Sequence, residues 1–400
     1  MSDLAQAAAQ RLAQRWMVSS DSHVIEPPDL WQSRMPANLR DRGPIVREEE
    51  SGHWWYVDGY RTMSFLGIQA GDRFVKHADE LRISGRFSDV TPNSQDPARY
   101  IAESASDGVW GSVLYPSQGL VLYAVPVSDV LTAAARAYND WLAEFCSHDP
   151  RRLKGVAMLN ADDPADAVRE LTRAHKLGLC GAMIPLAQPH WLPYRSREFD
   201  VLWAAAQDLG MPLSLHTAAD RADWKQGAAA FRLNIAEVPP SVFVNKDFQV
   251  RQALADMIFS GVFERFPKLL VGTVEHELSW IPFFLDQLDY TYTDRPRRGT
   301  WHKFKDPATL PSDFFRRNVF CSFQQDAVGV RLRDVIGLHT LMFGTDYPHT
   351  ESTYPRTIPI MAEILADVPE GEAHAIVCGN AARLYGFDPP PVRSGQKAAA

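Results

Sequence analysis

The chain has 400 residues, of which 46% are hydrophobic and 22% charged, and its formal net charge is −8. This length and balance are typical of a globular protein with one large α/β domain or two smaller ones. The negative charge and the lack of a basic run argue against nucleic-acid binding, and no apolar stretch reaches membrane-spanning length. The four cysteines have no paired spacing, which favours reduced thiols in a cytoplasmic protein.

Residues 1–16 predict a short N-terminal arm, and a β-prone apolar run starts at Met17. Asp21 and His23 lie in this run and face the same side of the predicted strand, because side chains two apart in a strand point the same way. A long insertion, about 27–97, follows. The segment GHWWYVDGYR inside it (52–61) predicts an aromatic hairpin that lines a site or forms a subunit contact.

Seven more apolar strands are expected to alternate with amphipathic helices, with a second insertion at about 218–245. The strands are expected at 109–117, 154–160, 179–187, 211–217, 268–277, 317–323 and 339–346. This order predicts a single (β/α)8 TIM barrel over 17–387, with a disordered tail at 388–400. A doubly wound open sheet is the alternative, but no glycine-rich phosphate loop follows any strand.

Side chains that can bind a metal follow several of these strands. They are Asp21 and His23 on the first, His216 on the fifth, Glu275 and His276 on the sixth, and Asp346 on the eighth, with His349 three residues further on. The carboxyl ends of barrel strands meet at one mouth, so we expect this set to converge there and to form a divalent-metal site. A core role is the usual explanation for any single histidine, but it does not account for the whole set.

Five segments carry a family resemblance that runs from about Ser19 to Phe387. They are DSHVIEPPDLW, LSLHT, VEHELSWIP, FGTDYPHTESTYP and GNAARLYG. The chain resembles the amidohydrolase superfamily, and most of all its branch with aminocarboxymuconate semialdehyde decarboxylase and the dihydroxybenzoate decarboxylases. The resemblance implies a metal-dependent barrel and a homodimer. It also implies that Asp21, His23, His216 and Asp346 bind the metal and that His276 is catalytic or metal-binding.

Two departures from the family pattern bear on the number of metals. The fourth strand, LCGAMIPLA, has no lysine that could bridge two ions after carboxylation. Glu275 stands where the decarboxylases have a small residue before the histidine. This carboxylate either binds a second metal or orients His216 or His276, and the sequence favours neither role.

Three reactions fit this set of residues. One zinc or manganese ion would support hydrolysis or the decarboxylation of a carboxylated aromatic, with His276 or Asp346 handling the proton. Two iron ions would support oxygen activation. The whole-chain pattern resembles a subgroup with a non-haem di-iron monooxygenase of platensimycin biosynthesis. We therefore slightly favour a monooxygenase with a bulky apolar, coenzyme A-linked substrate over a hydrolase or a decarboxylase. A scaffold that has lost its metal is the non-enzyme alternative.

Other polar residues near the predicted strand ends have weaker expectations. Arg356 and His349 are candidate substrate contacts, although a salt bridge to Glu351 is the favoured role for Arg356. Gln324 and Gln325 are expected near the mouth. Ser117 has no histidine–acid pair at a readable spacing, so a serine nucleophile is not expected.

Overall fold

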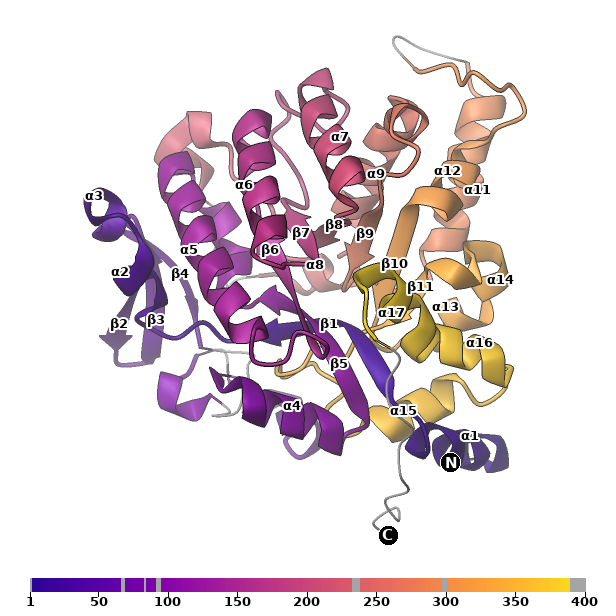
Figure 1. Ribbon diagram of the computed structural model, residues 1–400, viewed down its shortest axis with the longest axis horizontal. Helices are drawn as coiled ribbons and strands as arrows, with labels where there is room; N and C mark the ends of the chain where they lie inside the picture. Colours follow the sequence, from indigo (N-terminus) through magenta and orange to yellow (C-terminus); the bar gives the residue numbers. More distant parts are fainter. Residues whose placement is uncertain are drawn as a thin grey trace.

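Eight parallel strands form the centre of the protein and confirm the predicted (β/α)8 barrel (Figure 1). The computed structural model describes residues 2–65, 69–82, 84–90, 95–231, 238–296 and 301–388. The strands follow each other in the sheet in chain order: β1 (Met17–Val24), β5 (Val109–Pro116), β6 (Leu153–Met158), β7 (Gly181–Ile184), β8 (Leu213–His216), β9 (Val271–Val274), β10 (Val319–Phe323) and β11 (Leu341–Phe343). Every residue of β1 is buried, as expected for a strand covered on both sides.

The barrel closes where β1 meets the segment that follows β11. The amide of Asp346 donates to the carbonyl of Asp21 at 2.8 Å, and the amide of His23 donates to the carbonyl of Tyr347 at 2.7 Å. Three candidate metal ligands, Asp21, His23 and Asp346, therefore hold β1 and the segment after β11 together through their backbones. The eighth strand ends at Phe343, earlier than predicted, so Asp346 belongs to the turn that follows it.

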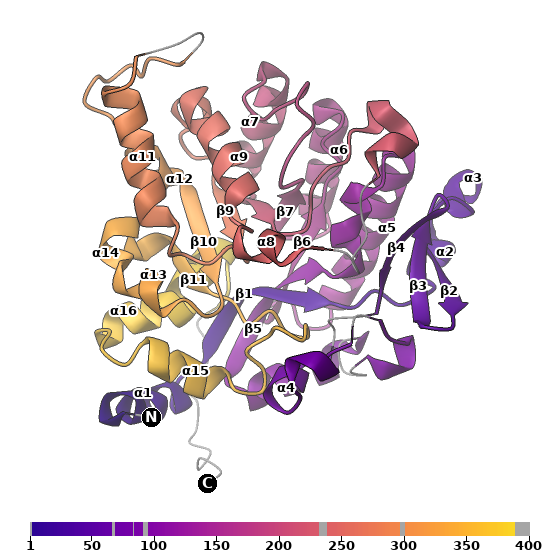
Figure 2. The ribbon, with the colours of Figure 1, turned by 180° about the vertical axis from the view of Figure 1, so that it is seen from behind.

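Helices surround the sheet, as the alternation of strands and helices predicts (Figures 1 and 2). The longer ones are α4 (Pro97–Ser106), α5 (Ser128–Cys146), α6 (Pro164–Lys176), α7 (Asp200–Leu209), α9 (Phe248–Phe259), α11 (Ile281–Thr293), α12 (Pro311–Asn318) and α15 (Thr357–Ile364). The shorter ones are α10 (Val262–Arg265), α13 (Ala327–Arg331), α14 (Arg333–Ile336), α16 (Glu370–His374) and α17 (Asn380–Tyr385). The helical segment between β8 and β9 is divided into α9 and α10 at Gly261, whose φ of 74° is left-handed.

The first insertion builds a small antiparallel sheet beside the barrel. The predicted hairpin is present as β3 (Gly52–Val57) and β4 (Tyr60–Ser64), and β2 (Ile45–Glu49) adds a third strand that the sequence did not indicate. Two short helices, α2 (Leu30–Arg34) and α3 (Ala37–Arg40), lead into it. The second insertion contains α8 (Pro240–Val244), and its residues 232–237 lie outside the described part of the chain.

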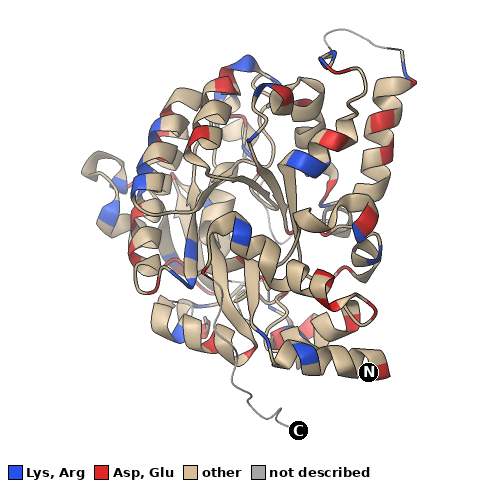
Figure 3. Cartoon of the chain, turned by 45° about the vertical axis from the view of Figure 1, so that its right-hand side comes forward, with Lys and Arg blue, Asp and Glu red and all other residues tan. Residues whose placement is uncertain are grey.

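The N-terminal segment forms helix α1 (Asp3–Ala13), which packs against α15. Residues 389–400, most of the predicted disordered tail, lie outside the described residues. Acidic and basic residues both occur on the outer helices in the view of Figure 3. Among the described helices, none has the length and hydropathy needed to cross a bilayer.

Candidate metal centre

Five of the predicted site residues meet at one end of the barrel. Strand β1 supplies Asp21 and His23, β8 ends in His216, and the turn after β11 supplies Asp346 and His349. The pairing of β1 with β5 has an irregularity between Ser19 and Ser22, which lies next to Asp21. The ligand atoms of Asp21, His23 and His216 form one compact group, and those of His23, Asp346 and His349 form a second that shares His23.

The distances within the first group and to Asp346 suit a single ion. Nε2 of His23 lies 3.5 Å from Oδ1 of Asp21 and 3.1 Å from Oδ1 of Asp346. Nε2 of His216 lies 3.5 Å from the same Asp21 oxygen. Donor atoms that sit roughly 2.1 Å from a common zinc or similar ion are roughly 3.0–3.4 Å apart, so this spacing matches a first coordination shell.

Hydrogen bonds on the far side of the two histidine rings leave Nε2 free to face an ion. Nδ1 of His23 lies 2.8 Å from the carbonyl oxygen of Pro116, and Nδ1 of His216 lies 3.0 Å from that of Thr217. Since a carbonyl only accepts, Nδ1 carries a proton in both rings, so Nε2 is the nitrogen that can present a lone pair to an ion when the ring is neutral. This arrangement is typical of metal-binding histidines.

The donor atoms are buried and lack ordinary partners. Both carboxylate oxygens of Asp21 and Asp346, and Nε2 of His23 and His216, form no hydrogen bond within the ranges that the structure describes, and histidine rings are their nearest ionisable neighbours, including His349 beside Oδ1 of Asp346. Burial acts to raise the pKa of Asp21, but His216 and His23 outweigh it and lower that pKa to about 2. Ionised carboxylates without donors are costly in a buried site, and a divalent cation removes that cost. The residues present therefore fit a metal ion.

His349 contacts two of the four proposed donors and is not one of them. Its ring stacks on His23 with centroids 3.9 Å apart, and its Nδ1 lies 2.8 Å from Oδ1 of Asp346. Its Nε2 forms a 2.9 Å hydrogen bond with the hydroxyl of Ser117. The sequence shows no histidine–acid pair at a readable spacing from Ser117, because the chain separates Ser117 from His349 by 232 positions and only the fold brings them together.

Glu275 and His276 lie beside the centre and outside both compact groups. Oε2 of Glu275 is 3.8 Å from Nδ1 of His216, which is the side of that ring opposite the free Nε2. Burial raises the pKa of Glu275 well above its usual value. This geometry favours the second of its two expected roles, a partner that orients His216.

His276 is a buried histidine with two unengaged nitrogens. Neither Nδ1 nor Nε2 has a hydrogen-bond partner among the described residues, and burial lowers the pKa of the ring well below its usual value. On both sides of it, Glu275 and Glu277 have left-handed φ angles of 63° and 56°. Backbone strain of this kind concentrates at functional sites. A neutral His276 can accept a proton at one nitrogen and donate at the other.

Arg73, which sequence reasoning missed, reaches the centre from the first insertion. Its Nε donates to the carbonyl of Ser352 at 2.9 Å, and its terminal nitrogens donate at 2.9 and 2.6 Å to Gln325 when that amide turns its oxygen toward them. Burial lowers the pKa of Arg73, whereas the charges of Glu351 and Asp346 act in the opposite direction. Arg356 instead is exposed and packs on the ring of Phe74, 5.4 Å from its centroid. The expected salt bridge from Arg356 to Glu351 is absent from the described structure.

Gln324 and Gln325 follow β10 as predicted, and their amides donate to Oε2 of Glu277 at 3.2 and 3.3 Å. The side chain of Gln324 is buried, with Nε2 lacking a partner in the part of the chain that is described.

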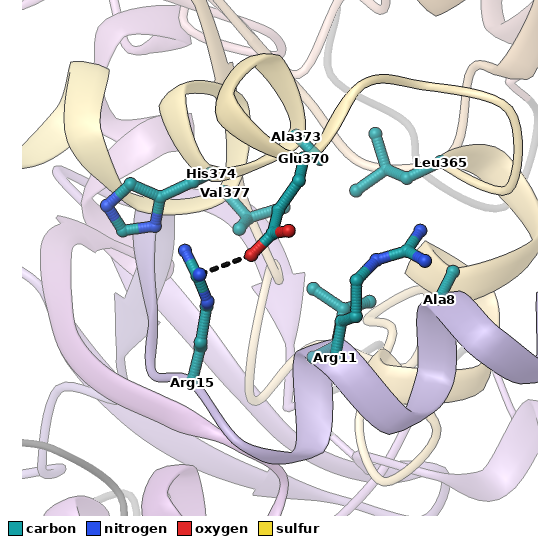
Figure 4. A pocket seen from close by; sticks show the side chains of 9 residues that line it. Ala8, Arg11, Arg15, Leu365, Glu370, Ala373, His374 and Val377 are labelled. Atoms are coloured by element: carbon teal, nitrogen blue, oxygen red, sulfur yellow. Dashed lines mark hydrogen bonds and ion pairs between the residues drawn. The ribbon is translucent and has the colours of Figure 1, made fainter.

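A small groove lies away from this centre, between α1 and α16 (Figure 4). Arg15 and Glu370 form an ion pair across it, and His374 lies beside them. Its volume of about 20 Å³ leaves space for water and none for a substrate.

Comparison with known proteins agrees with this geometry. The family model described as "Amidohydrolase" matches residues 53–387, so the chain belongs to this family. The matched range contains His216 and Asp346 and starts after Asp21 and His23. Sequence identity to gamma-resorcylate decarboxylase of Polaromonas sp. is 27% over 283 residues, 66% of this chain and 79% of that protein. Decarboxylase orsB of Emericella nidulans is 30% identical over 182 residues, 42% of this chain and only 54% of that protein.

Solved structures show the same fold. An amidohydrolase from Mycobacterium avium subsp. paratuberculosis K-10 superposes with a TM-score of 0.71 at 20% identity, covering 93% of this chain and 99% of the other. A dihydroxybenzoic acid decarboxylase from Polaromonas sp., solved with manganese and 2-nitroresorcinol, has a TM-score of 0.60 at 18% identity, with 93% and 97% coverage. The named decarboxylases among the curated relatives favour the decarboxylase alternative over the di-iron monooxygenase that the sequence analysis placed first.

Proposed function

We propose that this protein is a metal-dependent enzyme that removes carbon dioxide from a carboxylated aromatic compound without oxidation, with one manganese or zinc ion. The observation that carries this proposal is the cluster of four buried donors from Asp21, His23, His216 and Asp346, spaced by 3.1–3.5 Å. The named decarboxylases among its relatives support the reaction class.

Metal binding and substrate binding fall to different residues of this chain in the proposed reaction. Asp21, His23, His216 and Asp346 would hold the ion. When bound, the ion supplies a Lewis acid that fixes the substrate's oxygens and withdraws electron density from the ring. Arg73 is the positive side chain placed to pair with a carboxylate at the mouth, because its planar guanidinium can bind two oxygens at once.

Proton handling falls to His276 in this proposal. Loss of carbon dioxide leaves an electron pair on the ring carbon, which takes up one proton. The buried ring of His276 is neutral and has no other hydrogen-bond partner among the described residues, so it can hold or transfer that proton at either nitrogen. Asp346 is the second candidate for this step, but the neighbouring His349 and His23 hold its pKa far below the usual value against the effect of burial, which favours its role as a ligand.

The test is carbon dioxide release by the full chain loaded with Mn²⁺. Carboxylated phenols such as 2,6-dihydroxybenzoate and 5-carboxyvanillate are the first compounds to assay, with product analysis by chromatography. We expect release that disappears after chelation and in His216→Ala. The exposed His148→Ala is the matched control and should retain full activity.

Two results would overturn the proposal. One is hydrolysis of neutral esters or lactones by the Mn²⁺ or Zn²⁺ protein without any release of carbon dioxide. The other is binding of two iron ions per chain together with oxygen uptake, which would restore the monooxygenase.

A further inference from the structure

Ser117 and His349 link three strand ends to the carboxylate of Asp346. Ser117 directly follows β5, and His349 lies in the turn after β11. Their 2.9 Å hydrogen bond joins Oγ of Ser117 to Nε2 of His349, and Nδ1 of the same ring lies 2.8 Å from Oδ1 of Asp346. Both nitrogens of His349 are therefore engaged. The sequence analysis expected this ring to contact a substrate, but in this arrangement it is not free to do so.

Each member of this link is itself held in place. The hydroxyl of Ser117 lies 2.8 Å from the carbonyl of Val24, and its amide donates to the buried carboxylate of Glu26. The ring of His349 stacks on His23 at an interplanar angle of 24°. Strand β1 thus fixes Ser117 and His349 from two sides, and a movement of either side chain would be passed on to Asp346.

The backbone of Asp346 makes such support necessary. Its φ of 59° is left-handed, a region that few non-glycine residues occupy without local constraints. Its amide bonds to the carbonyl of Asp21 and its carbonyl accepts from the amide of His349, so the backbone is fixed while the carboxylate still rotates about its side-chain bonds. Nδ1 of His349 lies 2.8 Å from Oδ1 of that carboxylate, nearer than Nε2 of His23, which lies 3.1 Å from the same oxygen.

A catalytic serine is not a competing explanation for this Ser–His–Asp connection. Ser117 is only 2% exposed, and its oxygen lies between the carbonyl of Val24 and the ring of His349. A nucleophile has to present its oxygen to the substrate, which this packing prevents.

We propose that Ser117 and His349 are a positioning pair that sets the orientation of the Asp346 carboxylate and thereby the affinity of the centre for a divalent metal. This inference rests on the proposed function only for the presence of a metal site. It assigns to the pair no contact with substrate and no part in bond breaking. Partners that orient a metal-binding carboxylate typically contribute 10- to 100-fold to metal affinity.

The test is a titration of the metal-free full chain with Mn²⁺, with free Mn²⁺ followed by electron paramagnetic resonance. The variants are Ser117→Ala, His349→Gln and the double substitution. We expect affinity for Mn²⁺ to fall about 10- to 100-fold in His349→Gln and less in Ser117→Ala. The double variant should be no weaker than His349→Gln alone, because Ser117 acts through His349. Ser117→Thr, which keeps the hydroxyl, should restore the wild-type affinity.

Ser322→Ala is the matched control. Ser322 is a buried serine on β10 whose hydroxyl bonds to Ser20 at 2.7 Å, and its removal should leave Mn²⁺ affinity unchanged. The signal of bound Mn²⁺ gives a second readout, since a reoriented carboxylate changes its line shape while a loss of stability alone does not.

Unchanged Mn²⁺ affinity in both single variants would overturn the inference, and so would fully additive losses in the double variant. If His349→Gln does not fold, the Ser117→Ala and Ser117→Thr comparison decides alone. Failure of the proposed function looks different: wild-type protein binds Mn²⁺ and the variants behave as expected, but no carbon dioxide is released.

Discussion

Two arginines pack on the ring of Phe74 and differ in what else they contact. The guanidinium of Arg73 is 4.5 Å from the ring centroid and also bonds to the carbonyl of Ser352, whereas Arg356 is exposed at 5.4 Å. The sequence offered Arg356 as a substrate contact because it follows the strand-eight motif. It could not offer Arg73, because nothing in the insertion indicates which of its arginines turns toward the barrel.

We therefore expect Arg73→Ala to reduce kcat/KM for a carboxylated substrate about 10- to 100-fold, mainly through KM, because a charge-assisted hydrogen bond contributes about 1.5–3 kcal/mol. Metal content should not change. Arg356→Ala is the control and should have wild-type kinetics. Equal effects of the two substitutions would show that Arg73 has no special role at the mouth.

Glu26 is the buried carboxylate at the start of the short 3-10 helix η5 (Gln118–Ala124). It accepts hydrogen bonds from the amides of Gln118 and Gly119, both at 2.9 Å. Burial raises its pKa from 4.5 to about 6, against the effect of these amides. The folded state thus binds this proton more tightly than the unfolded state. The stabilising contribution is complete below pH 4.5 and is lost as the pH rises through 6.

The difference in unfolding free energy between wild type and Glu26→Gln should consequently fall by about 2 kcal/mol from pH 4.5 to pH 7, since a shift of one pKa unit corresponds to about 1.4 kcal/mol. Glu26→Gln loses hydrogen bonds at every pH, so the informative quantity is the slope of this free-energy difference against pH. Urea unfolding across this range measures it, with the exposed Glu198→Gln as reference. A flat difference would mean that Glu26 titrates normally.

At the scale of elements, the segment that follows His216 is fixed by a buried ion pair. Arg221 bonds to both oxygens of Asp162, which follows β6, at 2.7 and 2.8 Å. It also donates to the carbonyls of Tyr123 and Val125 at 2.9 and 2.7 Å. The side chains of Arg221 and Asp162 are 0% and 4% exposed, so solvent does not reach the pair. Together with the two carbonyls, the pair connects the segments that follow β5, β6 and β8.

Arg221→Leu should lower the free energy of unfolding by about 3–5 kcal/mol, because it leaves the charge of Asp162 buried without a partner. Arg195→Ala removes the exposed pair with Asp256, whose side chains are 55% and 34% exposed, and should cost less than about 1 kcal/mol. Denaturant unfolding of both variants makes the comparison. Similar losses would mean that solvent reaches Asp162 once Arg221 is gone.

The elements that could be predicted from sequence are those with continuous patterns. Most barrel strands are mainly apolar runs, although β1 contains Ser, Asp and His, and α5 and α6 have strong helical periodicity, so local signals were enough. Strand β2 was missed because Ile45–Glu49 contains three charged residues and depends on pairing with β3. The contact of Ser117 with His349 was missed because it depends on how the barrel closes, which the separate strand patterns do not contain.

At the scale of the whole molecule, metal binding should be linked to unfolding. The donors of the centre come from β1, β8 and the turn after β11, so the unfolded chain cannot present them together. Mn²⁺ at 100 times its dissociation constant should stabilise the protein by about 2.7 kcal/mol and raise Tm. Differential scanning calorimetry with and without a chelator measures the shift. The same shift in His216→Ala would place the bound ion elsewhere.

The homodimer that the family resemblance implies stays a prediction at this scale. Analytical ultracentrifugation of the full chain, with and without Mn²⁺, distinguishes a dimer from a monomer. A monomer under both conditions would contradict it.

The hydrogen bonds that close the barrel also have a consequence for how the protein is made. Asp21 and Asp346 are 325 positions apart (346 − 21), so a ribosome that adds about 5–20 residues per second produces the last ligand roughly 15–65 s after the first. During that interval the growing chain carries Asp21 and His23, joined later by His216, as an incomplete and weak chelator. We therefore expect the ion to be selected after translation has passed the final strand, so that the free metal available to the finished chain decides which ion it holds.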